Sequence, residues 1–283
     1  MKKFIKIYTL LIVLFVFPLI CVASSQGEKV AVICVPHTYE DAVYPIDSMK
    51  SYLHQNNVVC VEYVIDNSGS QSLQQLSQAL LQEVKNLHKQ YANAKIGLVT
   101  LDEACFTGML ACTQQPMDYI ITINGIFSDG FDYYYDMQLL RGGINGSSEA
   151  ISYRSDVYQA LQCIKQGKKL ENVSSAVNAL CLDSPYKTSV VNYQYKEVLN
   201  ELTTPLFAIF PYQDEGWHND SQYATNIQME MAKDKNFNYR TWIVPKFEGA
   251  KEMIRNKEYM MIYEFMQTKD NSFTKQLVEK FIK

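Results

Sequence analysis

The chain has 283 residues, of which 47% are hydrophobic, and a formal net charge of −4. This composition supplies one sizeable core and excludes an intrinsically disordered chain. Lysine and arginine residues are scattered along the sequence without a basic stripe, so we expect no nucleic-acid partner.

The first 25 residues are typical of a secretory signal peptide. Three lysines precede an apolar run over residues 7–23, and small residues follow. We expect cleavage near Ser24 or Ser25, export to the periplasm or the extracellular space, and membrane contact only through this segment. The alternatives are an uncleaved membrane anchor and a lipoprotein acylated at Cys21.

Residues 26–283 alternate between apolar runs typical of buried strands and segments with helical periodicity. The pattern predicts strands over 29–35, 58–65, 94–101, 118–123, 205–211 and 238–244, and helices over 46–55, 72–92, 103–113, 221–232 and 272–282. Such alternation predicts an α/β domain with a mostly parallel sheet of about six strands and helices on both faces.

Residues 128–195 depart from this alternation. They are polar, rich in tyrosine and helical in pattern, which predicts a helical cap inserted over one end of the sheet. The aromatic residues of 131–135, together with Trp217, either line a ligand cleft or pack the insertion against the sheet, and packing is the interpretation we favour.

The cysteines match no zinc-binding pattern and no compact disulfide framework. Cys34 and Cys60 lie inside apolar strands and are interpreted as core residues. Cys163 and Cys181 fall in the same helical region, which makes them the pair to test for a disulfide bond.

A strand over residues 95–101 runs directly into a helix, and sharp turns of this kind carry the nucleophile in α/β hydrolases. Four other stretches occur in the order found in that family: the turn at 66–70, the segment 118–130, Ser184-Pro185-Tyr186, and 205–214. In this order of segments the chain resembles the α/β-hydrolase family, in particular the bacterial serine-hydrolase branch related to aminopeptidases and acyl esterases.

The resemblance places Asp102 where the family has its nucleophilic serine. In the motif Gly-x-Ser-x-Gly, Thr100 and Ala104 replace the two glycines, and Glu103 follows the replaced nucleophile. The resemblance therefore implies a degenerate catalytic triad.

The other two triad positions fall late in the chain. Asp214 matches the acid, whereas the position of the histidine base is occupied by Gly249, with Glu248 beside it. A carboxylate without an imidazole base offers no route to a serine acyl-enzyme. His37 and His218 are the histidines that could approach the site, and both are interpreted as loop residues.

Two chemical alternatives stay open at this site. Dehalogenase-like members of the fold use an aspartate nucleophile, but they also need a histidine that activates water. Alternatively, Asp102, Glu103, Asp214 and Glu248 could converge on a hard cation, although solvated loop carboxylates are the interpretation we favour. We expect neither a bound metal nor a cofactor.

The sequence predicts an exported α/β-hydrolase-fold protein that is catalytically impaired and binds a small molecule, peptide or partner in the inherited cleft. The first alternative is an active hydrolase of ester, amide or halide substrates with Asp102 as nucleophile or metal ligand. The second is an envelope protein whose surface mediates interactions.

Overall fold

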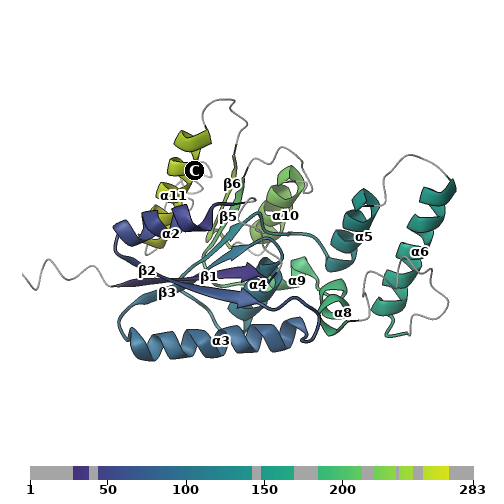
Figure 1. Cartoon of the computed structure of the whole chain (residues 1–283), viewed down its shortest axis with the longest axis horizontal. Coiled ribbons are helices and arrows are strands. Elements are labelled where there is room, and N and C mark those ends of the chain that lie inside the picture. Colours follow the sequence, from purple (N-terminus) through teal and green to yellow (C-terminus); the bar gives the residue numbers. More distant parts are fainter. Residues whose placement is uncertain are drawn as a thin grey trace, which may run out of the picture.

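Six parallel strands form a single sheet at the centre of the molecule (Figure 1). This computed structural model describes residues 28–37, 44–141, 148–168, 184–211, 220–233, 236–244 and 251–267. The strands are β1 (Lys29–Pro36), β2 (Val58–Ile65), β3 (Lys95–Leu101), β4 (Ile120–Ile123), β5 (Leu206–Phe210) and β6 (Tyr239–Ile243). They lie in the order β2-β1-β3-β4-β5-β6, which confirms the predicted parallel sheet.

The apolar run of β1 is continuous because both faces of the sheet are covered. Val30, Val32 and Cys34 contribute to one hydrophobic cluster, while Ala31 and Ile33 contribute to the other. Successive side chains of a strand point to opposite faces, so a strand buried on both sides needs apolar residues at every position.

Helices cover both faces of the sheet, as predicted (Figure 1). One face is covered by α3 (Leu73–Gln90), α4 (Ala104–Gln114), α9 (Tyr195–Glu201) and α10 (Asp220–Lys233), and the other by α2 (Ile46–Gln55) and α11 (Lys251–Gln267). Helix α3 begins at a capping box in which Ser72 and Gln75 satisfy each other's backbone N–H groups.

Between β4 and β5 the chain forms α5 (Gly130–Arg141), α6 (Ser148–Lys165) and α8 (Pro185–Val191), which pack against one another. Figure 1 shows α5 and α6 beyond the end of the sheet toward which β1 points. Phe131, Tyr133 and Tyr134 are buried, as the packing interpretation of these aromatic residues requires. Trp217 lies outside the described residues.

The cysteine interpretations have mixed outcomes. Cys34 is fully buried, and Cys60 is partly buried against the core. Cys163 is a free thiol, and its proposed partner Cys181 lies outside the described residues.

Two predicted segments, the signal peptide over 1–25 and the helix over 272–282, also lie outside the described residues. Sequence analysis missed α11, although its buried residues Tyr259, Ile262, Phe265 and Met266 follow helical spacing. Among the helices that the structure describes, none combines the length and apolar character of a membrane span.

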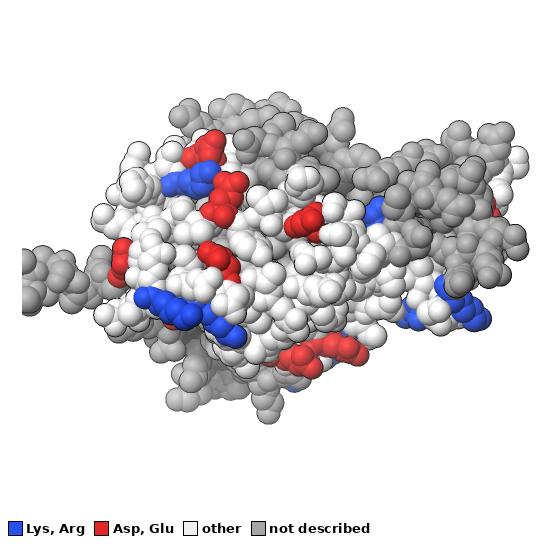
Figure 2. Space-filling view, turned by 60° about the horizontal axis from the view of Figure 1, so that its bottom comes forward, with Lys and Arg blue, Asp and Glu red and all other residues white. Residues whose placement is uncertain are grey.

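Charged side chains of both signs lie in small separate groups on the face shown in Figure 2. On this face the described residues form no broad region of a single sign. A large field of one sign, as needed to gather a polyanion, is therefore not a property of this face.

Helix α11 places a buried carboxyl group against the segment that leads into α2. Glu258 is 2% exposed and lies near the side chains of Arg255 and Tyr44. The Arg255 guanidinium also stacks on the Tyr44 ring at 4.8 Å from its centroid, and the Tyr259 hydroxyl donates to the Pro45 carbonyl oxygen over 3.3 Å. These contacts attach α11 to the start of α2.

We expect Glu258→Gln to stabilise the protein above neutral pH. Burial raises the pKa of Glu258 from 4.5 to about 7, although Arg255 and Tyr44 lower it. The native state therefore holds a proton that the unfolded chain releases, and this stabilising contribution is complete below pH 4.5 and lost as the pH rises through 7. At pH 8 the variant should gain up to about 3 kcal/mol of unfolding free energy.

Urea unfolding of both proteins between roughly pH 4 and pH 8.5 measures the difference in unfolding free energy, because carboxyl groups with a raised pKa titrate in this range. Glu264→Gln, at an exposed position of the same helix, is the matched control and should show no such pH dependence. A constant difference between Glu258→Gln and the original protein across the pH range would contradict the prediction.

Candidate functional site

The turn between β3 and α4 has the geometry of a nucleophile elbow. Asp102 follows the last residue of β3 and has a φ of 45°, in the left-handed region. Its N–H donates to the Ile123 carbonyl oxygen over 3.1 Å, and its own carbonyl oxygen accepts from the Cys105 N–H over 3.0 Å. Aspartate and asparagine adopt left-handed backbone more readily than most residues, so Asp102 suits this turn.

Asn124 holds the Asp102 carboxylate. It follows β4 as Asp102 follows β3, it also has a positive φ, of 56°, and its Nδ2 donates to Asp102 Oδ1. The strand register explains the contact, because Leu101 and Ile123 are paired and the next residue of each strand is therefore adjacent. Asn124 is itself fixed by its N–H, which donates to the Ile209 carbonyl oxygen over 2.8 Å.

The Asp102 carboxyl group is easier to protonate than an ordinary aspartate. Burial is the main cause that raises the pKa of Asp102 from 3.8 to about 6. The hydrogen bond from Asn124 opposes this shift, and the charge of Glu103 adds to it. Around neutral pH the group is mostly ionised, so it is an acceptor or a nucleophile rather than a serine-like donor.

Glu103 connects the elbow to the helical insertion. Its Oε2 accepts from Asn67 Nδ2 over 3.2 Å, and its Oε1 accepts from the Tyr133 hydroxyl on α5 over 2.8 Å. The hydroxyl of Tyr186, at the start of α8, also faces this carboxylate. Three elements far apart in sequence therefore meet at one side chain, and Glu103 is held as a structural acceptor.

A glycine in α4 makes room for the residue that replaces the first glycine of the motif. Thr100 is fully buried, and a Cβ atom added at Gly108 would lie 2.4 Å from Thr100 Cγ2. Ala104, at the second glycine position, is also fully buried. The elbow thus keeps its close strand–helix packing because the space lies at Gly108 rather than at residue 100.

The remaining predicted site residues are only partly placed by the structure. His37 is exposed directly after β1, and its N–H donates to the Ile65 carbonyl oxygen over 2.9 Å. Hydrogen bonds from Ser68 are the main cause that lowers the pKa of Asp66, and the nearby His37 lowers it further. Asp214, His218, Glu248 and Gly249 lie outside the described residues. Within the described ranges, no three histidine, cysteine or acidic residues gather as a metal site would require.

Sequence reasoning did not identify Asn67, Asn124, Tyr133 and Tyr186 as partners of the two elbow carboxylates. For Asn67 and Asn124 a signal was present, because each follows a predicted strand at the carboxyl edge of the sheet. For the tyrosines no local pattern points to residue 103.

No family model matches the chain, and no curated protein matches its sequence. Solved structures do match it over most of its length. An esterase from Pyrococcus furiosus has a TM-score of 0.54 at 11% identity, covering 86% of this chain and 82% of the esterase. Est1E from Butyrivibrio proteoclasticus has a TM-score of 0.52 at 11% identity, covering 87% and 91%.

An α/β-hydrolase enzyme from a Medee basin deep-sea metagenome library has a TM-score of 0.50 at 13% identity, covering 86% of this chain and 91% of that enzyme. Together with the six-stranded parallel sheet, these similarities show that the chain has the α/β-hydrolase fold. At such low identity they show the fold alone, and the activity of each enzyme remains a statement about that enzyme.

We expect Gly108→Ala to destabilise the protein by about 1–3 kcal/mol, because the new methyl group would collide with Thr100 Cγ2. In a Thr100→Ser background the colliding methyl is gone, and the same substitution should stabilise by up to about 1 kcal/mol through helix propensity. Urea unfolding of the four proteins of this double-mutant cycle measures the coupling. Equal effects of Gly108→Ala in both backgrounds would show that the packing argument is wrong.

Asp102→Asn should raise the unfolding free energy at pH 7.5 by about 2 kcal/mol, since it removes a partly buried charge and leaves an acceptor for Asn124. The raised pKa means that the native state keeps a proton the unfolded chain loses, so the advantage should vanish below pH 3.8. Thermal unfolding against pH tests this, with Asp156→Asn on α6 as the control. A variant less stable than the original at pH 7.5 would refute it.

Proposed function

We propose that this protein is an exported α/β-hydrolase-fold binding protein that lacks serine-hydrolase activity. The observation that carries the proposal is the Asp102 carboxylate, which stands at the elbow and is held there by Asn124. A serine hydrolase needs at this place a hydroxyl whose proton passes to a base, and a carboxylate that is mostly ionised has no such proton to give.

The histidines of the chain support the same conclusion. There are four. His54 lies in the last turn of α2 and His88 in the last turn of α3, both exposed. Because a helix that joins two parallel strands runs back from the carboxyl edge of the sheet to the amino edge, both lie away from the elbow. Only His37 and His218 are left as bases, and His37 lies beside Asp66 on the β2 side.

The proposed binding site is the carboxyl edge of the sheet around Asp102, which is where open α/β sheets bind ligands. One side of it is fixed by the Glu103 contacts to Tyr133 and Tyr186, so the insertion is attached to the elbow. An anionic acceptor at the centre favours a small molecule or peptide that presents a hydrogen-bond donor, such as an amine or amide. Export rests on the signal-like first 25 residues.

A second candidate function is hydrolysis with Asp102 as the nucleophile. It is favoured by the left-handed turn, which presents the side chain as in an active elbow, and by a carboxylate that is ionised near neutral pH. This mechanism forms an ester between substrate and Asp102, which water must then hydrolyse with help from a base. His37 or His218 would have to supply that base.

The purified protein should not react with a fluorophosphonate probe, because no serine stands at the elbow. We also expect no turnover of short-chain esters, aminoacyl amides or haloalkanes above the level of Asp102→Ala. Asp102→Ser, which introduces a hydroxyl, should still lack esterase activity, since Gly249 occupies the position at which the resemblance places the histidine base. Probe labelling followed by gel fluorescence and a spectrophotometric substrate screen measure these outcomes.

Turnover that disappears in Asp102→Ala would overturn the proposal and establish the second candidate. In that case His37→Ala and His218→Ala identify the base, because its loss stops hydrolysis of the Asp102 ester and leaves the ester detectable by mass spectrometry. Labelling of the original protein by the fluorophosphonate would contradict both candidates.

A further inference from the structure

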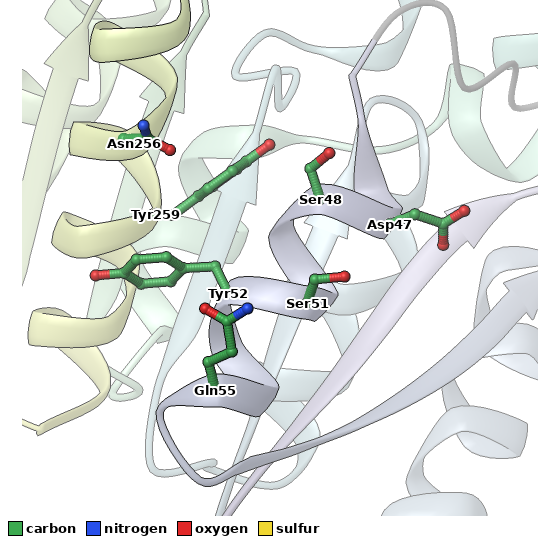
Figure 3. A pocket seen from close by; sticks show the side chains of 7 residues that line it. All are labelled: Asp47, Ser48, Ser51, Tyr52, Gln55, Asn256 and Tyr259. Carbon is green, nitrogen blue, oxygen red and sulfur yellow. The ribbon is translucent and has the colours of Figure 1, made fainter.

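A hollow of about 400 Å³ lies between α2 and α11, on the face of the sheet that these helices cover (Figure 3). None of its lining residues takes part in the Asp102 or Glu103 contacts. It is lined from α2 by Asp47, Ser48, Ser51, Tyr52 and Gln55, and from α11 by Asn256 and Tyr259.

The hollow exists because small residues leave the groove between the two helices unfilled. Ser48, Ser51 and Gln55 succeed one another at helical spacing along α2, and all three line the hollow. Packed helices normally fill such a groove with interlocking side chains, and two serines are too short to do so.

The partly exposed ring of Tyr52, which packs on the buried ring of Tyr259, gives the hollow an aromatic wall. Tyr259 is 3% exposed and packs against the ring of Tyr52, with 5.9 Å between centroids. Its hydroxyl is anchored to the Pro45 carbonyl oxygen, and its ring also meets Tyr44 edge to face. The wall is therefore held in place without a ligand and needs no rearrangement to bind one.

The remaining lining groups are neutral hydrogen-bonding groups. Within the described part of the chain, the side chains of Ser51, Gln55 and Asn256 make no hydrogen bond, so a hydroxyl and two amides are available. Asp47 is the one charged residue among the described residues of the lining, and its carboxylate forms an ion pair with Lys50 at 2.8 Å. Among the described residues that line the hollow, none is a cation that would bind a phosphate and none is aliphatic as a site for a lipid chain would be.

We propose that this hollow is a second binding site of the protein and that it takes a short neutral saccharide. A sugar ring presents hydroxyl groups at its edge and a C–H face that packs on an aromatic ring, which matches the amides and hydroxyls of the hollow and the partly exposed ring of Tyr52. The volume lies near the lower end of the range of about 300–1,000 Å³ of small-molecule sites, which suits one short saccharide. This site is independent of the function proposed for the elbow.

The test is saturation-transfer NMR of the purified protein with N-acetylglucosamine, glucose and cellobiose, with affinity from ligand titration. We expect saturable binding of at least one sugar in the millimolar range. Ser51→Leu fills the hollow and should weaken binding by about tenfold or more. Ser155→Leu, the same change at an exposed position of α6, is the matched control and should bind as the original protein does.

A second variant, Asn256→Ala, removes one of the free amides and should also weaken binding, with circular dichroism confirming that each variant is folded. Absence of saturable binding by all three sugars would overturn the proposal, and so would binding that Ser51→Leu and Asn256→Ala both leave intact.

Discussion

The left-handed turn at Asp102 is the constraint around which the carboxyl edge of the sheet is arranged. The turn lets the chain leave β3 and enter α4 within two residues, and it aims residue 102 out of the carboxyl edge of the sheet. The register of β3 with β4 then places Asn124 beside it, so the same sheet pairing that builds the core also supplies the hydrogen-bond partner of the carboxylate. Asn124 donates its hydrogen bond to a carboxylate, whereas a serine at position 102 would offer only a neutral hydroxyl. The side chain of residue 102 therefore has the chemistry of an anionic acceptor.

The two adjacent acids of the turn differ in how many hydrogen-bond donors compensate the burial of their carboxylates. Asp102 is partly buried with one strong donor, and its pKa rises to about 6. Glu103 accepts hydrogen bonds from Asn67 and Tyr133 and faces the hydroxyl of Tyr186, and these polar contacts compensate its carboxylate for lost hydration. The contacts of Glu103 are thus structural, and Asp102 is the acid of the turn that is available to a ligand. This arrangement argues against a site in which both carboxylates hold one cation.

The parts of the structure that sequence analysis predicts correctly are those determined by short, contiguous stretches of sequence. The bounds of α2 and β2 follow from Pro45 and from a run of apolar residues, and both elements lie where the pattern predicts them. Helix α11 escaped prediction because its buried side includes Glu258 while Met253 and Met260 are exposed, which blurs the apolar stripe. The Glu103 contacts join residues from 67 to 186, and only the folded sheet brings such distant positions together.

The turn at Asp102 separates what the fold requires from what serine hydrolysis requires. The fold requires a residue that tolerates a φ of 45° and close packing of α4 on β3, and Asp102 with Gly108 meets both demands. Hydrolysis requires in addition a nucleophile matched to a base, which is a demand on side chains alone. Solved esterases with the same fold at 11% identity show how far sequence can diverge while the first set of demands is kept. The elbow of this chain is therefore evidence for its architecture, and its activity has to be argued from Asp102 and the groups that surround it.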